Sequence, residues 1–151
     1  MVYRISNNGL TGWRPAISEV RAYSDSECTI EVDATFVDMS GHNSGHGDGS
    51  AAFDNAEDTL WRPQCQPCGI GEAWLSFAVA EEIECVRASD LGQGAGGSEW
   101  WNGGIKVELQ NADSTWTTAM ESTSGNIAST SLEGKLIFSI NLTLSIRTII
   151  L

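Results

Sequence analysis

The sequence predicts an all-β domain, arranged as a sandwich or a barrel. Two segments, Leu75–Val79 and Ile105–Gln110, alternate large apolar residues with smaller or polar ones. This period of two is typical of strands with one buried face. Helical patterning is scarce, because no stretch repeats apolar residues at helical spacing over more than about two turns. The 16 glycines also interrupt the chain repeatedly.

Further strands are expected between clusters of Gly, Ser, Asn and Asp. In chain order these weaker candidates are Val2–Ile5, Ile17–Tyr23, Thr29–Val32, Ile83–Ala88 and Trp116–Met120. The Gly-rich segments Ser40–Ser50 and Leu91–Gly97 are expected to be loops that a rigid β scaffold can use for binding.

The C-terminal segment differs in composition from the rest of the chain. Residues Leu136–Ile146 alternate cleanly between apolar and polar side chains, which favours an extra strand or an irregular tail. We therefore divide the chain into a domain at 1–121 and a C-terminal segment at 122–151. Leu136–Leu151 has 16 residues and several polar interruptions, so it falls short of the roughly 20 apolar residues that a spanning helix needs. Met1–Leu10 lacks the apolar region of a secretory signal.

Composition narrows the classes of partner. The 151 residues suit one domain, since single cores organise roughly 100 to 200 residues. Eight Lys and Arg against twenty Asp and Glu give a net charge of −12. This charge opposes ligands that are recognised through phosphates, so we expect no nucleic-acid partner and disfavour anionic membranes. Neutral sugars, basic partners and divalent cations remain.

One motif carries a family resemblance. Ala52–Trp61 reads AFDNAEDTLW and resembles the A-hydrophobic-D-G-x-x-x-T-x-W signature of discoidin domains, also called coagulation factor V/VIII C-type or galactose-binding-like domains. The similarity continues through Glu72–Val79, Ile83–Ala88 and Ile105–Trp116 in the family's order. The resemblance implies a discoidin-like jelly-roll β-sandwich with ligand-binding loops at one end.

The resemblance also implies a structural calcium ion under this motif. Its ligands map to Asp54, Thr59 and the backbone carbonyls of Ala51 and Ala56. Asn55 stands where the family has Gly, a substitution that left-handed backbone tolerates. The alternative is a calcium-free turn in which Asp54 caps backbone amides.

The family's last calcium ligand is a Glu on the strand that closes the domain. The nearest match here, SEVRAY at Ser18–Tyr23, comes before the calcium loop instead of after it. We infer a permuted strand order in which this N-terminal strand takes the place of the closing strand. Glu19 then reaches the ion, and Ser18 beside it joins the candidate metal ligands.

Two of the six tryptophans are candidate ligand contacts. The resemblance assigns Trp61, Trp74 and Trp116 to core or near-core positions. Trp100 and Trp101 follow a Gly-rich loop, and an exposed indole is a common platform for the apolar face of a sugar. Adjacent residues of an extended chain point to opposite sides, so one of the two is expected in the core and one on the surface.

The remaining candidate ligand contacts are polar. His42 and His46 are four residues apart in a glycine loop, and three interpretations stay open: a solvated loop, hydrogen bonding to a glycan, and a zinc site. Asn43, Arg62 and Glu99 are further candidates for contacts with sugar hydroxyls.

The four cysteines are Cys28, Cys65, Cys68 and Cys85. The C-x-x-C pair resembles half of a zinc site or a redox dithiol, but the sequence offers neither a second ligand pair nor a βαβ pattern. Disulfides are therefore expected, with three connectivities open. The first to test joins Cys65 to Cys68 and Cys28 to Cys85.

No catalytic motif is evident, and we expect a protein that is not an enzyme. The resemblance implies a non-catalytic carbohydrate-binding or adhesion module of an extracellular or cell-surface protein, with a galactose-type glycan as ligand. The alternative is a protein-interaction or structural module that contacts other domains of a larger extracellular protein.

Overall fold

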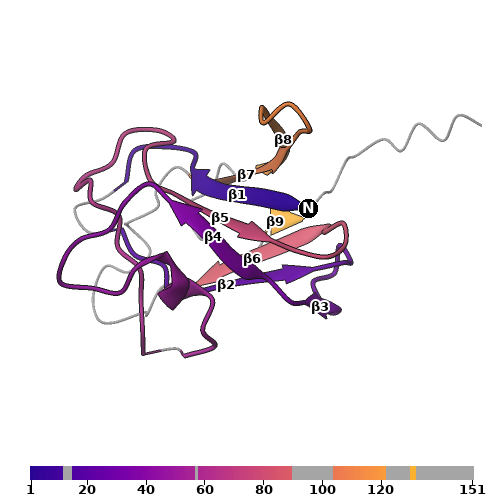
Figure 1. The fold of residues 1–151 in the computed structure, drawn as a ribbon, viewed down its shortest axis with the longest axis horizontal. Helices are drawn as coiled ribbons and strands as arrows, with labels where there is room; N and C mark the ends of the chain where they lie inside the picture. Colours follow the sequence, from indigo (N-terminus) through magenta and orange to yellow (C-terminus); the bar gives the residue numbers. More distant parts are fainter. Residues whose placement is uncertain (12–14, 57, 90–103, 122–129, 132–151) are drawn as a thin grey trace, which may run out of the picture.

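The chain folds as a β-sandwich of two antiparallel sheets, which confirms the predicted all-β class (Figure 1). The computed structural model describes residues 1–11, 15–56, 58–89, 104–121 and 130–131. The larger sheet has the order β4 (Thr35–Met39), β5 (Trp74–Ala78), β1 (Val2–Asn7), β7 (Ile105–Gln110), β8 (Trp116–Glu121). The smaller sheet has the order β3 (Glu31–Val32), β2 (Glu19–Tyr23), β6 (Cys85–Ser89), β9 (Thr130–Ser131).

The core lies between the two sheets, where the period-two alternation places apolar side chains. From the larger sheet, Tyr3 pairs with Phe77 across β1 and β5, and both rings are fully buried. From the smaller sheet, Val20 and Val86 join the same cluster. Burying such side chains contributes about 1.5–3 kcal/mol each, so this cluster is the main stabilising feature of the sandwich.

The N-terminal strands take central positions in both sheets. β1 pairs with β5 on one side and with β7 on the other. β2 pairs with β6, and its first residue, Glu19, lies opposite Ser89. In the smaller sheet, β9 from the C-terminal segment adds to the other side of β6.

The seven strands expected within 1–121 are all present; β7 has the expected bounds, and the bounds of the other six are shifted. β4 was not predicted, and it forms an edge strand with a register shift between Phe36 and Asp38. The glycine loop Ser40–Ser50 leads into a 3₁₀ turn, η1 (Gly49–Ala52). Leu91–Gly97 and Leu136–Leu151 lie outside the described residues. Among the described residues, no helix is long and apolar enough to cross a membrane.

Candidate functional site

The segment after η1 forms a tight turn around Asp54. Asp54 Oδ1 accepts a hydrogen bond from the backbone amide of Ala56 at 2.9 Å. Asn55 has φ of 60°, so it adopts the left-handed conformation expected at the family's Gly position. The amide of Thr59 closes the turn by donating to the carbonyl of Ala56 at 3.1 Å.

Oxygen atoms crowd around the hydroxyl of Thr59. Thr59 Oγ1 lies 3.0 and 2.9 Å from the two carboxylate oxygens of Asp54. It also lies 3.1 Å from the carbonyl of Ala51 and 2.8 Å from the carbonyl of Ala56. A hydroxyl donates one proton at a time, so it cannot satisfy all these acceptors together. An assembly of carboxylate, carbonyl and hydroxyl oxygens is the donor set that Ca²⁺ prefers.

Glu19 brings a second carboxylate to this turn from the start of β2. The Glu19 side chain accepts a hydrogen bond from the backbone of Asn55. Glu19 is only 5% exposed. Glu19 Oε2 is buried without a hydrogen-bond partner among the described residues. Burial raises the pKa of Glu19, Arg21 opposes this effect, and the negative charge of Asp54 adds to it. A buried carboxylate beside a like charge is costly unless a cation compensates it.

The surroundings of Glu19 are polar. A small pocket next to it is lined by side chains from β2, the β3 region and the turn, including Arg21, Glu31 and Asn55. The Ser18 hydroxyl points to β6 instead, where it contacts the carbonyl and hydroxyl of Ser89 at 3.1 and 3.2 Å. Within the described ranges no three His, Cys, Asp or Glu side chains gather, so cation binding at this turn would depend on carbonyl and hydroxyl oxygens as well as on two carboxylates.

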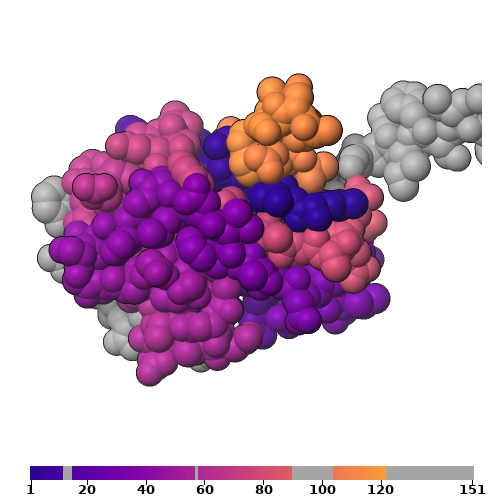
Figure 2. Space-filling model, in the orientation of Figure 1, coloured from indigo at the N-terminus to yellow at the C-terminus, as the bar shows by residue number. Residues whose placement is uncertain are grey.

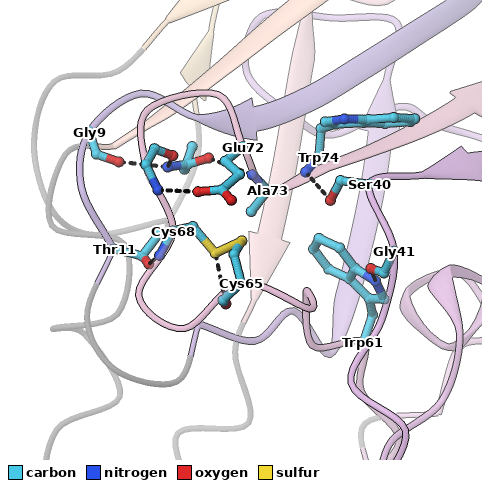
Figure 3. The surroundings of a disulfide bond; sticks show 12 residues. Gly9, Thr11, Ser40, Gly41, Trp61, Cys65, Cys68, Glu72, Ala73 and Trp74 are labelled. Atoms are coloured by element: carbon cyan, nitrogen blue, oxygen red, sulfur yellow. Dashed lines mark hydrogen bonds between the residues drawn. A yellow bond between two sulfur atoms is a disulfide. The ribbon is translucent and has the colours of Figure 1, made fainter.

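The predicted polar contacts gather on a neighbouring loop. The amide of Asn43 donates to the carbonyl of Arg62 at 2.9 Å, and the amide of His46 donates to the carbonyl of Asn43 at 3.0 Å. Trp61 is buried beneath this loop, and its indole N–H donates to the carbonyl of Gly41 at 3.0 Å (Figure 3). His42 is exposed on the same loop. These backbone contacts place the loop that carries His42, Asn43 and His46 against Arg62, three residues beyond Thr59.

The tryptophans divide into three groups. Trp61 lies in the core, as the resemblance implies. Trp74 and Trp116 are instead half-buried on strands β5 and β8, outside the core cluster. Trp13, Glu99, Trp100 and Trp101 lie outside the described residues.

Both disulfides have the pairing chosen for the first test. Cys28–Cys85 has a Cα–Cα distance of 5.5 Å and joins the turn after β2 to the start of β6. Cys65–Cys68 has a Cα–Cα distance of 4.9 Å and closes a short loop beside Thr11 (Figure 3). The amide of Cys68 donates to the Thr11 hydroxyl at 2.8 Å, so this loop is fastened to the N-terminal segment.

Asn7, at the end of β1, holds two loops together and was not identified from the sequence. Its Nδ2 donates to the carbonyls of Gly9 and Gly69, both at 2.7 Å, and its Oδ1 accepts from the amide of Ala73 at 3.0 Å. The residue is 1% exposed. The sequence feature that could have indicated this role is an Asn at the end of a strand, just before a turn that contains Gly9.

We expect Asn7→Ala to lower the free energy of unfolding by about 2 kcal/mol, because it leaves two partly buried carbonyls and the buried amide of Ala73 unsatisfied. Urea unfolding measures this loss. Asn111→Ala is the matched control, since the exposed side chain of Asn111 donates to the hydroxyls of the exposed Thr115 and Thr117, and it should stay within about 0.5 kcal/mol of the wild type. Equal losses in the two variants would contradict the clamping role of Asn7.

A scan against protein-family models finds no match to this chain, and neither a curated protein nor a solved structure matches it.

Proposed function

We propose that the chain is a non-catalytic carbohydrate-binding or adhesion module stabilised by calcium, built as a discoidin-like jelly roll with a permuted strand order. The observation that supports this most is the convergence of oxygen atoms from Asp54, Thr59, Ala51 and Ala56 on one turn, with the buried carboxylate of Glu19 beside them. Glu19 comes from an N-terminal strand, which supports the permuted order.

The residues of this turn fit a calcium ion. All the atoms that would coordinate the ion are oxygens, and the side chains of Asp54 and Glu19 are carboxylates. Glu19 Oε2 has no hydrogen-bond partner among the described residues. A bound cation supplies positive charge that offsets the repulsion between the carboxylates of Glu19 and Asp54. Such an ion is structural, because it binds the folded state in preference to the unfolded chain.

The proposed calcium turn, Asp54–Thr59, is connected to the polar loop that carries His42, Asn43 and His46. Gly47 forms a bridge to Trp61, and η1 links the loop directly to the turn. A rigid turn therefore fixes the base of a loop that carries His42, Asn43 and His46. These side chains offer hydrogen bonds to sugar hydroxyls, and we propose a galactose-type glycan as the ligand. Affinity for one sugar is expected to be weak, since few contacts must offset the cost of ordering both partners.

We also propose that the protein is extracellular or exposed at the cell surface. Disulfides persist in oxidising compartments, and all four cysteines are paired here.

A second candidate function is a protein-interaction module of a larger extracellular protein. Leu10 and Ile70 are 69% and 70% exposed, and they lie next to Gly9 and Gly69, which Asn7 holds together. Two exposed aliphatic side chains on joined loops favour contact with another protein surface or domain.

A glycan array of the purified protein in calcium tests the proposed function. We expect binding to galactose-terminated glycans that falls about tenfold in His42→Ala, which corresponds to one lost hydrogen bond of ~1.4 kcal/mol. Ser44→Ala is the control, because Ser44 is exposed on the same loop. Trp100→Ala and Trp101→Ala test the sugar platform predicted from the sequence. A blank array from folded protein would favour the protein-interaction module.

A further inference from the structure

The outer face of the larger sheet carries a cluster of charged and aromatic side chains that is separate from the calcium turn. On β1, Tyr3 and Ile5 point into the core, so Arg4 between them points outward. Glu108 of β7 lies directly opposite Arg4. On β5, Leu75 is buried in the core, so its neighbour Trp74 also faces outward.

A β-bulge brings a second indole to this face. Met120 of β8 is buried opposite Val107, and strict alternation would turn Trp116 to the same inner side. The register shifts between Val107 and Glu108, which places Trp116 opposite Gln110 on the outer side. In Figure 2 the β7–β8 hairpin, drawn in orange, protrudes from the body of the molecule beside β1, drawn in indigo.

Arg4 lies at the centre of the cluster. Its Nε and Nη2 donate to Glu108 Oε2 at 3.0 and 2.7 Å, and Lys106 Nζ lies 3.0 Å from Glu108 Oε1. The guanidinium carbon is 4.5 Å from the ring centroid of Trp116 and 5.9 Å from that of Trp74. Both distances are within the range of cation–π interactions, so Arg4 contacts both indoles. We call Arg4, Trp74, Lys106, Glu108 and Trp116 the outer-face cluster.

The five residues of the outer-face cluster carry a net charge of plus one, since two cations face one carboxylate, and the exposed Glu121 of β8 lies opposite Lys106 on the same face. Burial acts to raise the pKa of Glu108, but the hydrogen bonds and charges of Lys106 and Arg4 outweigh it and hold this pKa below its usual value. Glu108 thus stays ionised, and each of its oxygens already has a cationic partner. The Arg4 and Lys106 side chains remain 25% and 29% exposed. Arg4 uses two of its five N–H donors in these described bonds.

We propose that the outer-face cluster binds a sugar that carries a carboxylate, of the uronic acid type. Such a sugar presents an apolar C–H face that stacks on an indole and an anionic group that pairs with Arg4 and Lys106. A simple anion lacks the face for the indoles, and a neutral sugar lacks the charge. Polyanions are disfavoured by the net charge of −12. The proposal is independent of the glycan site on the His42 loop.

The test is a titration of the ¹⁵N-labelled full chain, followed by amide chemical shifts, with three probes. Galacturonate is expected to shift amides of β1, β5, β7 and β8. Galactose, which has the same ring without the carboxylate, and acetate, which has the carboxylate without the ring, are each expected to bind this face at least about tenfold more weakly. Raising the salt concentration should weaken galacturonate binding, since the ion pairs are partly exposed.

Variants distinguish binding at the outer-face cluster from binding at the loop that carries His42. Trp116→Ala is expected to reduce galacturonate affinity about tenfold. Lys106→Gln removes one charge without removing an indole and is expected to reduce it about threefold, so a second variant is available if Trp116→Ala does not fold. His42→Ala should leave galacturonate binding unchanged. Equal affinity for acetate or galactose at this face, or galacturonate shifts confined to residues 41–48, would overturn the proposal.

Discussion

Replacing both Cys28 and Cys85 with alanine is expected to lower the free energy of unfolding by about 4 kcal/mol. The disulfide joins residues 57 apart in the sequence, so it removes a large amount of chain entropy from the unfolded state. Both residues are buried, and Cys85 starts a strand that lies between β2 and β9. The loss is comparable to the whole stability of a marginal domain, so part of the protein is expected to be unfolded at 37 °C.

The matched control is the double variant of Cys65 and Cys68. That disulfide spans three residues, so the same entropy argument gives a loss of only about 2 kcal/mol. Guanidinium unfolding of the two double variants measures the difference. Equal losses would contradict the chain-entropy explanation, and a larger loss from Cys65 and Cys68 would show that their loop, fastened to Thr11, matters more than the long cross-link.

The parts of the fold that the sequence predicts are those whose local pattern matches their environment. Leu75–Val79 alternates because β5 has one face in the core, and its predicted position is nearly that of the strand. β4 was missed because it is an edge strand whose register shifts at Val37, so its side chains do not follow a simple alternation. Its sequence, TFVDM, also carries an exposed Asp38.

The candidate site residues were likewise predictable only where a local sequence pattern marks them. Asp54 and Thr59 were found because their spacing belongs to a local motif, and one turn brings them together. The outward position of Trp116 depends on a bulge in the pairing with β7, and the role of Asn7 depends on two loops that are distant in the sequence. Such features arise from contacts between strands and loops, and a pattern read along one strand does not contain them.

Calcium at about 100 times its dissociation constant is expected to add about 2.7 kcal/mol to the free energy of unfolding. For a domain of this size that corresponds to a rise of about 10 °C in melting temperature. Asp54→Asn should remove most of this rise, because it takes a charge from the donor set. Differential scanning calorimetry in calcium and in excess chelator measures both. A wild-type melting temperature that is the same in both solutions would favour the calcium-free turn.

Glu19→Gln is expected to act in opposite directions with and without the ion. In chelator at neutral pH, the variant should be more stable than the wild type, because it removes a buried charge beside Asp54. The folded-state pKa of Glu19 is raised, so the stability it contributes is present below its ordinary pKa and is lost as the pH rises through the raised value. The advantage of the variant should therefore vanish in acid.

In calcium, the order of stability should reverse, because the wild-type carboxylate then pairs with the ion, whereas the neutral amide of the variant does so only weakly. Glu84→Gln is the control, since Glu84 is exposed and the change should shift stability by less than about 0.5 kcal/mol in either solution. If Glu19→Gln keeps the full response to calcium, Glu19 is not a ligand, and the permuted position of its strand loses its main support. If Glu19→Gln is more stable than the wild type in chelator and is not stabilised by calcium, the result would support the Glu19 carboxylate as a ligand of the ion.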